Sequence, residues 1–324
     1  MLNLLGAGHA YPDNVLSNGQ LRELFGDKEV SGEQLGIVSR RTTLPWEYIK
    51  TTKNQSPVEA QAVASETPTD LAERAATLAV ERAGISFEEI GLILGATATP
   101  LQTTPSEAQR LGARLDLKIP AYDLYCGGGD LALQLATLAS WKSNKVPDYV
   151  LCVSTNTPTE RVNYSKGDEG FFFGDGAAAV VVSRKNPGKY KVISSNLRTY
   201  PAVSDIIEIE LYGHAGVDFS RLKEWVVPGL RAEISSILEN TQLSAKGAGW
   251  IDPQIGPGLF KDIATEFGDL NFLLKDPKES TAYCMGASPF QVLSEKWNQH
   301  TAGDLVLLVC GAGMCLGHVY LGRD

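Results

Sequence analysis

Cys126 is the cysteine whose neighbours best suit covalent chemistry. It follows the short strand-like segment Ala121 to Tyr125, and three glycines separate it from Asp130 and an apolar run that continues to Ala136. This order predicts a strand, a turn and a buried helix, so that amides at the helix N-terminus point at the sulfur and stabilise a thiolate. The glycines let a substrate approach the backbone closely. A structural cysteine on a glycine-rich turn is the alternative, and the segment alone leaves both open.

The other cysteines suit packing rather than a covalent framework. They are Cys152, Cys284, Cys310 and Cys315, which together with Cys126 make an odd total. No pair has CxxC spacing, and the spaced His/Cys sets of a structural zinc site are missing, so we expect neither a disulfide framework nor a metal site. Most of these thiols are expected to be small, buried apolar residues.

Length and charge narrow the class of protein. A chain of 324 residues is long enough for one large domain or for two packed halves. It has no apolar run long enough to span a bilayer, and Met1 to Leu5 lacks the basic flank of a signal peptide, so we expect a cytoplasmic protein with no membrane partner. The net charge of -9 disfavours nucleic-acid binding, which needs a basic face. It leaves room for an acidic carrier protein that docks on a local basic patch.

Alternating strands and helices must position Cys126. Strands are predicted at 2–5, 90–98, 122–125, 149–154, 177–183, 191–195, 250–252, 305–309 and 318–321. Helices are predicted at 69–83, after Pro105 and at 129–141, the first of them with start signals at Thr67 to Asp70 and a stop at Gly84. The helix at 129–141 is apolar nearly all round, so it should be buried in the middle of the protein.

The two halves of the chain resemble each other weakly. The strand pair at 148–153 and 173–184 is echoed by the pair at 304–309 and 311–323. This repeat predicts a duplicated αβ unit whose seam lies near the turn signal Asn186-Pro187-Gly188.

Two motifs resemble the β-ketoacyl synthase III family. The pattern Cys-x-Gly-x-x-x-Ala-Leu-x-x-Ala, starting at Cys126, is similar to its nucleophile motif, and Phe173-Gly-Asp-Gly-Ala177 is similar to its F-G-D-G-A strand entry. Further similar segments follow in the family's order at 6–18, 37–41, 75–99 and 305–317, so the resemblance extends over nearly the whole chain.

The resemblance implies a thiolase-like α/β fold of duplicated αβαβα layers, with two central mixed sheets around buried helices. It implies an N-terminal half, 1–186, that carries Cys126, and a C-terminal half, 187–324, that carries Gln254, Tyr283 and the closing turn Gly311-Ala312-Gly313. It also implies an acyl group carried on Cys126. The donor would be a thioester of coenzyme A or of the phosphopantetheine of an acyl carrier protein, with no tightly bound cofactor. The backbone amides of Cys126 and Ala312 would form the oxyanion hole.

Two catalytic side chains of the family are replaced. Gln254 stands where the family motif W-x-x-P-H-Q-A-N has its His, and Tyr283 or Cys284 stands where the motif G-N-x-x-A-x-S has its Asn. Glutamine can donate a hydrogen bond but cannot shuttle a proton at neutral pH, so decarboxylative condensation is the least expected of the family's activities. His214 is a candidate substitute base, and a surface or tunnel-wall histidine is the alternative.

Cationic side chains are candidates for binding the phosphates of the donor or for docking a carrier protein. They are Arg40, Arg41 and Lys261, and solvated surface charges are the alternative. The family's tryptophan before this region, which stacks on the adenine of coenzyme A, is absent, since the window reads Gln34-Leu35-Gly36. This favours a carrier protein or another donor without coenzyme A.

Two functions of different classes fit these residues. The first is a ketoacyl synthase III-like acyltransferase of fatty-acid or polyketide-type biosynthesis, working as a dimer because the family's nucleophile region packs at a two-fold interface. The second is a catalytically reduced partner that forms a heterodimer with an active ketosynthase homologue and shapes its pocket or chain length. A nucleotide-binding α/β enzyme is disfavoured, because residues 126–130 do not form GxGxxG and the chain has no phosphate loop.

Overall fold

One mixed sheet of ten strands is the frame of the protein. The computed structural model describes residues 1–26, 34–241, 243–268, 270–273, 282–300, 303–312 and 314–323, and the strand order is β12-β11-β13-β14-β8-β1-β7-β6-β4-β5. The strands are β1 (Leu2–Ala10), β4 (Leu92–Gly95), β5 (Ala121–Asp123), β6 (Val150–Asn156), β7 (Gly176–Ser183), β8 (Tyr190–Thr199), β11 (Ala248–Ile251), β12 (Asn271–Phe272), β13 (Asp304–Gly311) and β14 (Cys315–Gly322). Every strand predicted from the sequence overlaps one of these, which confirms the predicted alternation.

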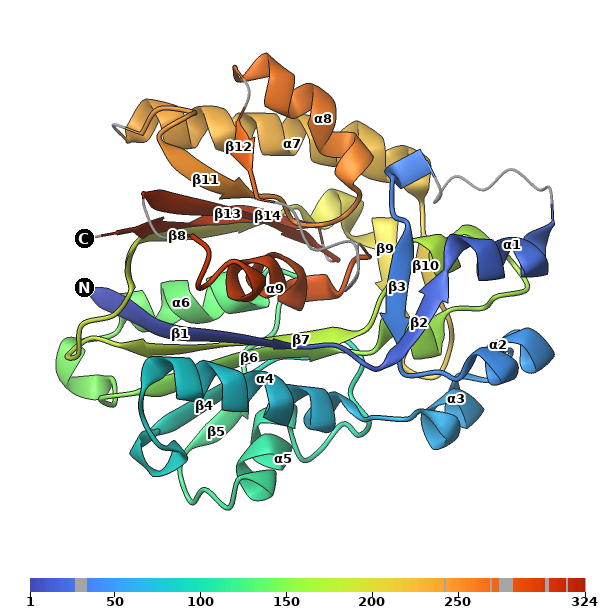
Figure 1. Cartoon of the computed structure of the whole chain (residues 1–324), viewed down its shortest axis with the longest axis horizontal. Helices are drawn as coiled ribbons and strands as arrows, with labels where there is room; N and C mark the ends of the chain where they lie inside the picture. Colours follow the sequence, from blue (N-terminus) through green and yellow to red (C-terminus); the bar gives the residue numbers. More distant parts are fainter. Residues whose placement is uncertain are drawn as a thin grey trace.

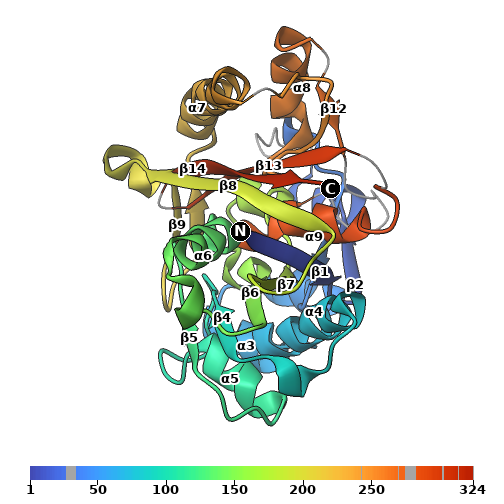
Figure 2. The same ribbon diagram turned by 90° about the vertical axis from the view of Figure 1, so that its left-hand side faces the viewer.

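The sheet folds over at β8, so its two ends form two layers. Strand β8 pairs with β1 near its start, where Val192 lies opposite Leu2, and with β14 along most of its length, up to Thr199 opposite Cys315. The two sheets that the resemblance implied are therefore joined into one. Helices α6 (Asp130–Ser140) and α9 (Ser288–Glu295) lie between the layers, as Figures 1 and 2 show.

Further helices cover the outer faces and complete an αβαβα arrangement (Figure 1). Helices α4 (Pro68–Ala83) and α5 (Glu107–Arg114) cover one layer, and α7 (Phe219–Asn240) and α8 (Pro257–Glu266) cover the other. At one end lie the small sheets β2 (Asn14–Ser17) with β3 (Ser39–Thr42) and β9 (Ile207–Ile209) with β10 (Ala215–Val217), beside α1 (Asn18–Phe25), α2 (Trp46–Thr52) and α3 (Pro57–Val63). No helix within the described ranges combines the length and apolarity needed to cross a membrane.

Strand order is the same in both layers when each is followed from its outer edge inward. One layer runs β5-β4-β6-β7-β1 and the other β12-β11-β13-β14-β8. In each layer the first two pairings are parallel and the next two antiparallel. We propose to divide the chain into the halves 1–186 and 187–324, because this boundary falls in the connection between β7 and β8.

Helix α4 follows its sequence signals closely. Thr67 caps its N-terminus by accepting from the amide of Asp70, whose carboxylate accepts in return from Thr67, and Gly84 ends the helix in the left-handed conformation. Helix α6 is buried along most of its length, with Leu131, Leu135 and Leu138 fully inside, as its apolar sequence predicted.

Three cations hold the carboxyl end of the central helix α9 and the turn that follows it. Arg82 donates through Nη1 to the carbonyl oxygen of Ser294 at 2.9 Å, and Arg323 donates to that of His300 at 3.0 Å. The ammonium of Lys189 contacts the carbonyl oxygen of Trp297. Because the last carbonyl groups of a helix lack partners within it and carry negative partial charge, the contact to Ser294 stabilises the helix end, and the other two contacts hold the turn that follows it.

Candidate active site

The turn that carries Cys126 lies against the turn between β13 and β14. We call residues 126–129 the cysteine turn and residues 311–312 the closing turn. A Cβ atom on Gly127 would lie 2.3 Å from the carbonyl oxygen of Ala312, and one on Gly128 would lie 2.5 Å from the Cα atom of Gly311. The φ angles of 86° at Gly127 and 152° at Gly128 also disfavour any other residue. These glycines let two turns that are far apart in the sequence meet beside Cys126.

The two backbone amides expected to bind an oxyanion, those of Cys126 and Ala312, lie in different surroundings. The amide nitrogen of Ala312 lies 3.4 Å from the Cβ position of Gly128 and so borders the cysteine turn. The N–H of Cys126 donates to Oδ1 of Asp130 at 2.9 Å. A carboxylate therefore already occupies the amide that the resemblance assigned to a thioester oxygen. Gly313 of the predicted closing turn lies outside the described residues.

The Cys126 thiol, which is partly exposed, is not the stabilised thiolate that the sequence predicted. A hydrogen bond with the Cys315 thiol, burial and the charge of Asp130 raise the pKa of Cys126, and the amide of Gly129 lowers it by less. The helix dipole does not prevail, because Asp130 is the first residue of α6 and places its own carboxylate at the positive end. The raised pKa contradicts the predicted thiolate and favours a neutral thiol as the resting form of the sulfur.

A buried polar chain leads from Cys126 into the protein. Oδ2 of Asp130 accepts a hydrogen bond from Ser154 Oγ at 3.1 Å, and Asn156 Nδ2 donates to Ser154 Oγ at 3.2 Å and to the carbonyl oxygen of Cys284 at 3.4 Å. Asp130, Ser154 and Asn156 are fully buried. The sequence interpretation missed all three. An aspartate opening an apolar helix and polar residues ending a buried strand were the available signals, because buried polar groups need partners.

Gln254 and Tyr283, which the sequence predicts in place of the family's catalytic side chains, are both buried. Gln254 has a φ of 61°, and its backbone amide donates to Oδ1 of Asp252 at 2.8 Å, an oxygen that its side-chain amide also contacts. The hydroxyl of Tyr283 donates to the carbonyl oxygen of Cys310 at 3.0 Å and lies 2.7 Å from the Cβ position of Gly128. Burial raises the pKa of Tyr283 well above its ordinary value, so this hydroxyl at the cysteine turn stays protonated.

Cys284 and His214 occupy different surroundings. Cys284 belongs to the hydrophobic cluster between the two layers, and its amide donates to Ser288 Oγ at 2.7 Å, which makes it a packing residue. His214 lines a cavity of about 230 Å³ together with three glutamates, and its Nε2 lies 3.0 Å from the carbonyl oxygen of Asn54. The described residues that line this cavity do not include the cysteine turn. The structure therefore does not bring His214 to Cys126 through this cavity.

Arg40 is a buried structural cation. Its guanidinium donates to the carbonyl oxygen of Leu16 at 3.0 Å, to Asn18 Oδ1 at 2.8 Å and to the carbonyl oxygen of Phe171 at 3.4 Å. Burial lowers the pKa of Arg40 to about 10. Because the side chain is fully enclosed, a phosphate of the donor cannot reach it. The predicted role in donor binding is wrong, and so is the alternative of a solvated surface charge.

Of the two other predicted cations, the structure describes the side chain of Arg41 alone. Arg41 lies on β3, is partly exposed, and donates to the carbonyl oxygens of Pro12 at 3.4 Å and Asp13 at 3.1 Å. The side chain of Lys261, on α8, lies outside the described residues.

A cavity of about 510 Å³ lies between α7, the start of α8 and the segment 34–35. Its lining includes Lys223, Val227 and Arg231, which follow one another at intervals of four residues and therefore lie on one face of α7. Arg231 forms an ion pair with Glu266 at 2.6 Å. The sequence interpretation missed this basic cavity, and the spacing of the two cations was the only signal for it.

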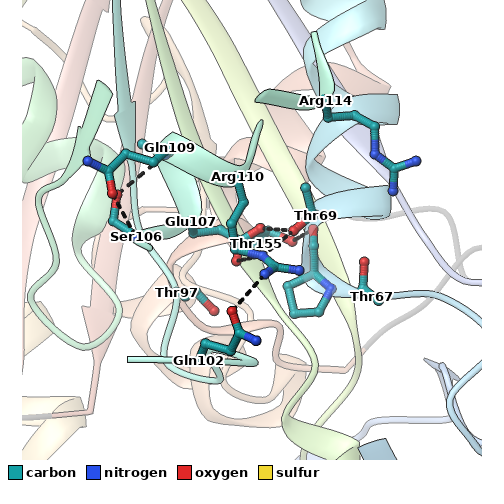
Figure 3. Close-up of polar contacts among 12 residues, drawn as sticks. Thr67, Thr69, Thr97, Gln102, Ser106, Glu107, Gln109, Arg110, Arg114 and Thr155 are labelled. Atoms are coloured by element: carbon teal, nitrogen blue, oxygen red, sulfur yellow. Dashed lines mark hydrogen bonds and ion pairs between the residues drawn. The ribbon is translucent and has the colours of Figure 1, made fainter. Parts of the chain in front are cut away.

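A second polar cluster holds the loop between β4 and α5 (Figure 3). Thr69 Oγ1 donates to Glu107 Oε1 at 2.5 Å, and Arg110 donates through Nε to Thr69 Oγ1 and through Nη1 to Gln102 Oε1, both at 3.2 Å. At the start of the loop, the backbone amide of Ala98 donates to Asn156 Oδ1 at 2.8 Å. This loop thus connects the N-terminus of α4 with the polar chain behind Cys126.

The aspartate of the Phe173–Ala177 motif lies beside a second buried carboxyl group. Burial raises the pKa of Asp175 to about 6. Burial, and next the charge of Asp175, raise the pKa of Glu160 to about 8. Thr43 Oγ1 lies within hydrogen-bond distance of both, 3.0 Å from Glu160 Oε1 and 3.1 Å from Asp175 Oδ2. Both carboxyl groups are therefore less costly to bury when they are protonated.

We expect the variant Glu160→Gln to gain stability relative to the natural protein as pH rises. The folded pKa of Glu160, about 8, lies above the value of an unfolded glutamate, so the stability that neutral Glu160 gives is complete below the unfolded pKa and is lost as pH rises through 8. Glutamine stays neutral, so the difference in unfolding free energy should shift by at least about 1 kcal/mol between pH 5 and pH 8 in favour of the variant.

Urea denaturation at these two pH values measures this shift. Glu239→Gln, which removes an exposed carboxylate from α7, is the matched control and should show almost no pH-dependent difference. A difference between Glu160→Gln and the natural protein that is the same at both pH values would contradict the expectation.

Comparison with known proteins places these observations in context. The family 3-oxoacyl-[acyl-carrier-protein (ACP)] synthase III matches residues 123–201, a stretch that contains the cysteine turn and the Phe173–Ala177 motif. The beta-ketoacyl-[acyl-carrier-protein] synthase III of Wolbachia pipientis wMel is 28% identical over 334 residues, which cover 98% of each chain. The enzyme of that name from Vesicomyosocius okutanii is 30% identical over 180 residues. That match spans 56% of this chain and only about half, 51%, of the relative.

The fold has a solved counterpart. The crystal structure of 3-oxoacyl-[acyl-carrier-protein] synthase III from Aquifex aeolicus VF5 superposes with a TM-score of 0.84 and 22% sequence identity, and the match covers 100% of both chains. A solved protein therefore has the layered arrangement of Figure 1 over its whole chain.

Proposed function

Since the chain is a β-ketoacyl synthase III-like protein of the thiolase superfamily, we propose that it is an acyltransferase that carries an acyl group on Cys126. The observation that carries this proposal is the contact between the cysteine turn and the closing turn, which brings the glycines that follow the partly exposed Cys126 against the backbone of Ala312. A thioester bound there would place its carbonyl carbon at the sulfur and its oxygen toward backbone amides, as acyl transfer requires.

The proposed reaction has two exchanges at one carbonyl group. In the first, the sulfur of Cys126 bonds to the acyl carbon, the bond from that carbon to the donor sulfur breaks, and the donor leaves as a free thiol. In the second, an acceptor takes the acyl group and Cys126 regains its proton. Gln254 and Tyr283 hold their protons at neutral pH, so neither takes the part of a general base. Decarboxylative condensation therefore stays the least expected variant.

The donor is proposed to be a thioester of coenzyme A or of an acyl carrier protein, without a tightly bound cofactor. The basic cavity beside α7 supports this, because Lys223 and Arg231 offer cations to a phosphate or to an acidic carrier surface. Lys223 and Arg231 thus take the donor-binding role that the sequence predicted for Arg40. The likeness to 3-oxoacyl-[acyl-carrier-protein] synthases supports fatty-acid or polyketide-type biosynthesis as the setting.

The proposed assembly is a homodimer through the edge strand β5. This strand ends the sheet shortly before Cys126. Tyr122 on it and Tyr125 just after it are 39% and 47% exposed in the single chain. An edge strand with exposed aromatic rings is a surface that pairing would cover. The five cysteines are free thiols, which suits the reducing cytoplasm as location.

Intact-protein mass spectrometry tests the function. We expect incubation with acetyl or octanoyl thioesters of coenzyme A, or of an acyl carrier protein, to add one acyl mass to the natural protein and none to Cys126→Ala. Cys152→Ala, which removes a thiol buried on β6, is the control and should keep the adduct. Absence of an adduct with every donor would refute the proposal and favour a catalytically reduced partner of an active homologue.

A further inference from the structure

We infer that Asp130 is a catalytic residue that accepts the proton of the Cys126 thiol and returns it to the leaving thiolate. This inference deepens the proposed acyl transfer and rests on it. In the first exchange the S–H proton of Cys126 moves to the Asp130 carboxylate while the sulfur bonds to the acyl carbon. The donor sulfur leaves with the electron pair of the broken C–S bond, and the proton passes from Asp130 to it.

The position of Asp130 supports this role. Its carboxylate accepts from the amide of Cys126 at 2.9 Å and interacts with the thiol of the same residue. The two residues are four apart, and the intervening glycine turn brings the cysteine backbone over the first turn of α6. Asp130 is therefore a carboxylate that is bound to the backbone of the reacting residue and whose charge acts on its sulfur.

The surroundings hold this carboxylate in one orientation. Ser154 Oγ donates to Oδ2 at 3.1 Å, and Asn156 Nδ2 donates to Ser154 Oγ at 3.2 Å. A Cβ atom on Gly286 would lie 2.2 Å from Oδ2, so the glycine on the other side leaves room for the carboxylate and for nothing larger. An acid held this closely can exchange a proton without reorganising.

Charge balance favours a proton transfer between these two groups. Burial raises the pKa of Asp130, and the Asp130 charge helps to raise the pKa of Cys126, so the pocket disfavours two negative charges at once. Attack on a thioester creates an oxyanion. If the proton has moved to Asp130, the pocket holds one negative charge before the attack and one after it.

The same transfer would free the oxyanion donor. In the resting protein the Cys126 amide donates to Asp130. A protonated carboxyl group is a weaker acceptor than a carboxylate, so proton transfer weakens this hydrogen bond as the oxyanion forms. The amide could then turn to the acyl oxygen, opposite the backbone of Ala312.

Other titratable groups around the pair do not compete for this proton near neutral pH. Tyr125, Tyr283 and Cys315 face Cys126 or Asp130. Burial raises the pKa of Tyr283, and partial burial together with the nearby charge of Asp130 raises the pKa of Tyr125, so both stay neutral. Cys315 shares a hydrogen bond with the Cys126 thiol, which makes it a partner of the donor rather than a base.

The experiment compares two reactions of Cys126 in the full-length protein and in Asp130→Asn. The first is acylation by octanoyl-coenzyme A, followed by intact-protein mass spectrometry. The second is alkylation by iodoacetamide near pH 8, which needs a thiolate but no proton for a leaving thiol. We expect Asp130→Asn to be alkylated as fast as the natural protein or faster, and to be acylated at least about tenfold more slowly.

Asp123→Asn is the matched control. Its carboxylate, three residues before Cys126, accepts from the amides of Glu107 and Ala108 instead, and we expect this variant to keep the acylation rate. Thermal denaturation of each variant shows that it is folded. If Asp130→Asn is acylated as fast as the natural protein or faster, Asp130 is only a repelling charge and the inference is overturned. If the natural protein forms no adduct at all, the proposed acyl transfer itself fails, and this role fails with it.

Discussion

Replacing Gly128 by alanine is expected to lower the free energy of unfolding by about 4 kcal/mol, the sum of an unfavourable backbone conformation and an overpacked contact. The new methyl group would lie 2.5 Å from the Cα atom of Gly311 and 2.7 Å from the hydroxyl oxygen of Tyr283. Because Gly311 offers only backbone there, relief requires that the cysteine turn and the closing turn separate. The acyl adduct on Cys126 should be lost with that contact.

Gly167→Ala isolates the backbone part of this effect. Its φ of 146° is close to the 152° of Gly128, but a Cβ atom there would have no heavy atom within 4 Å. We expect this control to cost about 1 to 2 kcal/mol and to keep the adduct. Urea denaturation and mass spectrometry measure both variants. Equal stability losses, or an undiminished adduct in a folded Gly128→Ala, would show that the meeting of the two turns does not matter.

Local patterns in the sequence were sufficient for much of the fold. Each predicted strand and the helices at 68–83, 107–114 and 130–140 follow from apolar periodicity and from capping residues, which act over a few positions. The sequence interpretation did not single out the 22-residue helix α7, whose interior Pro228 reads as a break. It also missed the joining of the two layers at β8, because a strand's pattern does not reveal how many neighbours it has.

The site shows where such reasoning stops. Residue type and local spacing identified Cys126, and the resemblance identified the closing turn that meets it. The same reasoning treated Arg40 as a charge on the surface, whereas carbonyl oxygens from segments 24 and 131 residues away enclose it. Asp130 was read as part of a helix start. Its importance depends on Ser154 and on contacts between elements, which a single sequence does not display.

The resting arrangement around Cys126 explains how an unusual site can remain compatible with acyl transfer. A cysteine with a raised pKa, a buried aspartate and an occupied amide would together describe an inert thiol if no proton could move. Transfer of one proton from Cys126 to Asp130 would activate the sulfur, neutralise the aspartate and weaken its hold on the Cys126 amide. The predicted replacement of the family's histidine by Gln254 would remove one base from the site, and Asp130, at the start of α6, is the base proposed instead.

The second large effect is expected at Asp175, the aspartate of the Phe173–Ala177 motif. Its carboxylate accepts from the amide of Thr43 at 2.7 Å and the amide of Thr159 at 2.9 Å, and from the hydroxyls of both threonines. Alanine would leave two buried N–H groups without a partner, which costs about 4 kcal/mol in total. This one residue therefore fastens the segment after β3 to the segment after β6.

Urea denaturation at neutral pH of Asp175→Ala, Asp175→Asn and the surface control Asp148→Ala checks this expectation. Asparagine keeps Oδ1 for the Thr159 amide but turns a donor toward Thr43, so its loss of stability should be about half that of alanine. Asp148 pairs with Lys185 at 2.8 Å on an exposed surface, where an ion pair contributes less than about 1 kcal/mol. If Asp175→Ala cost no more than Asp148→Ala, the aspartate of this motif would not be the fastening that its four hydrogen bonds indicate.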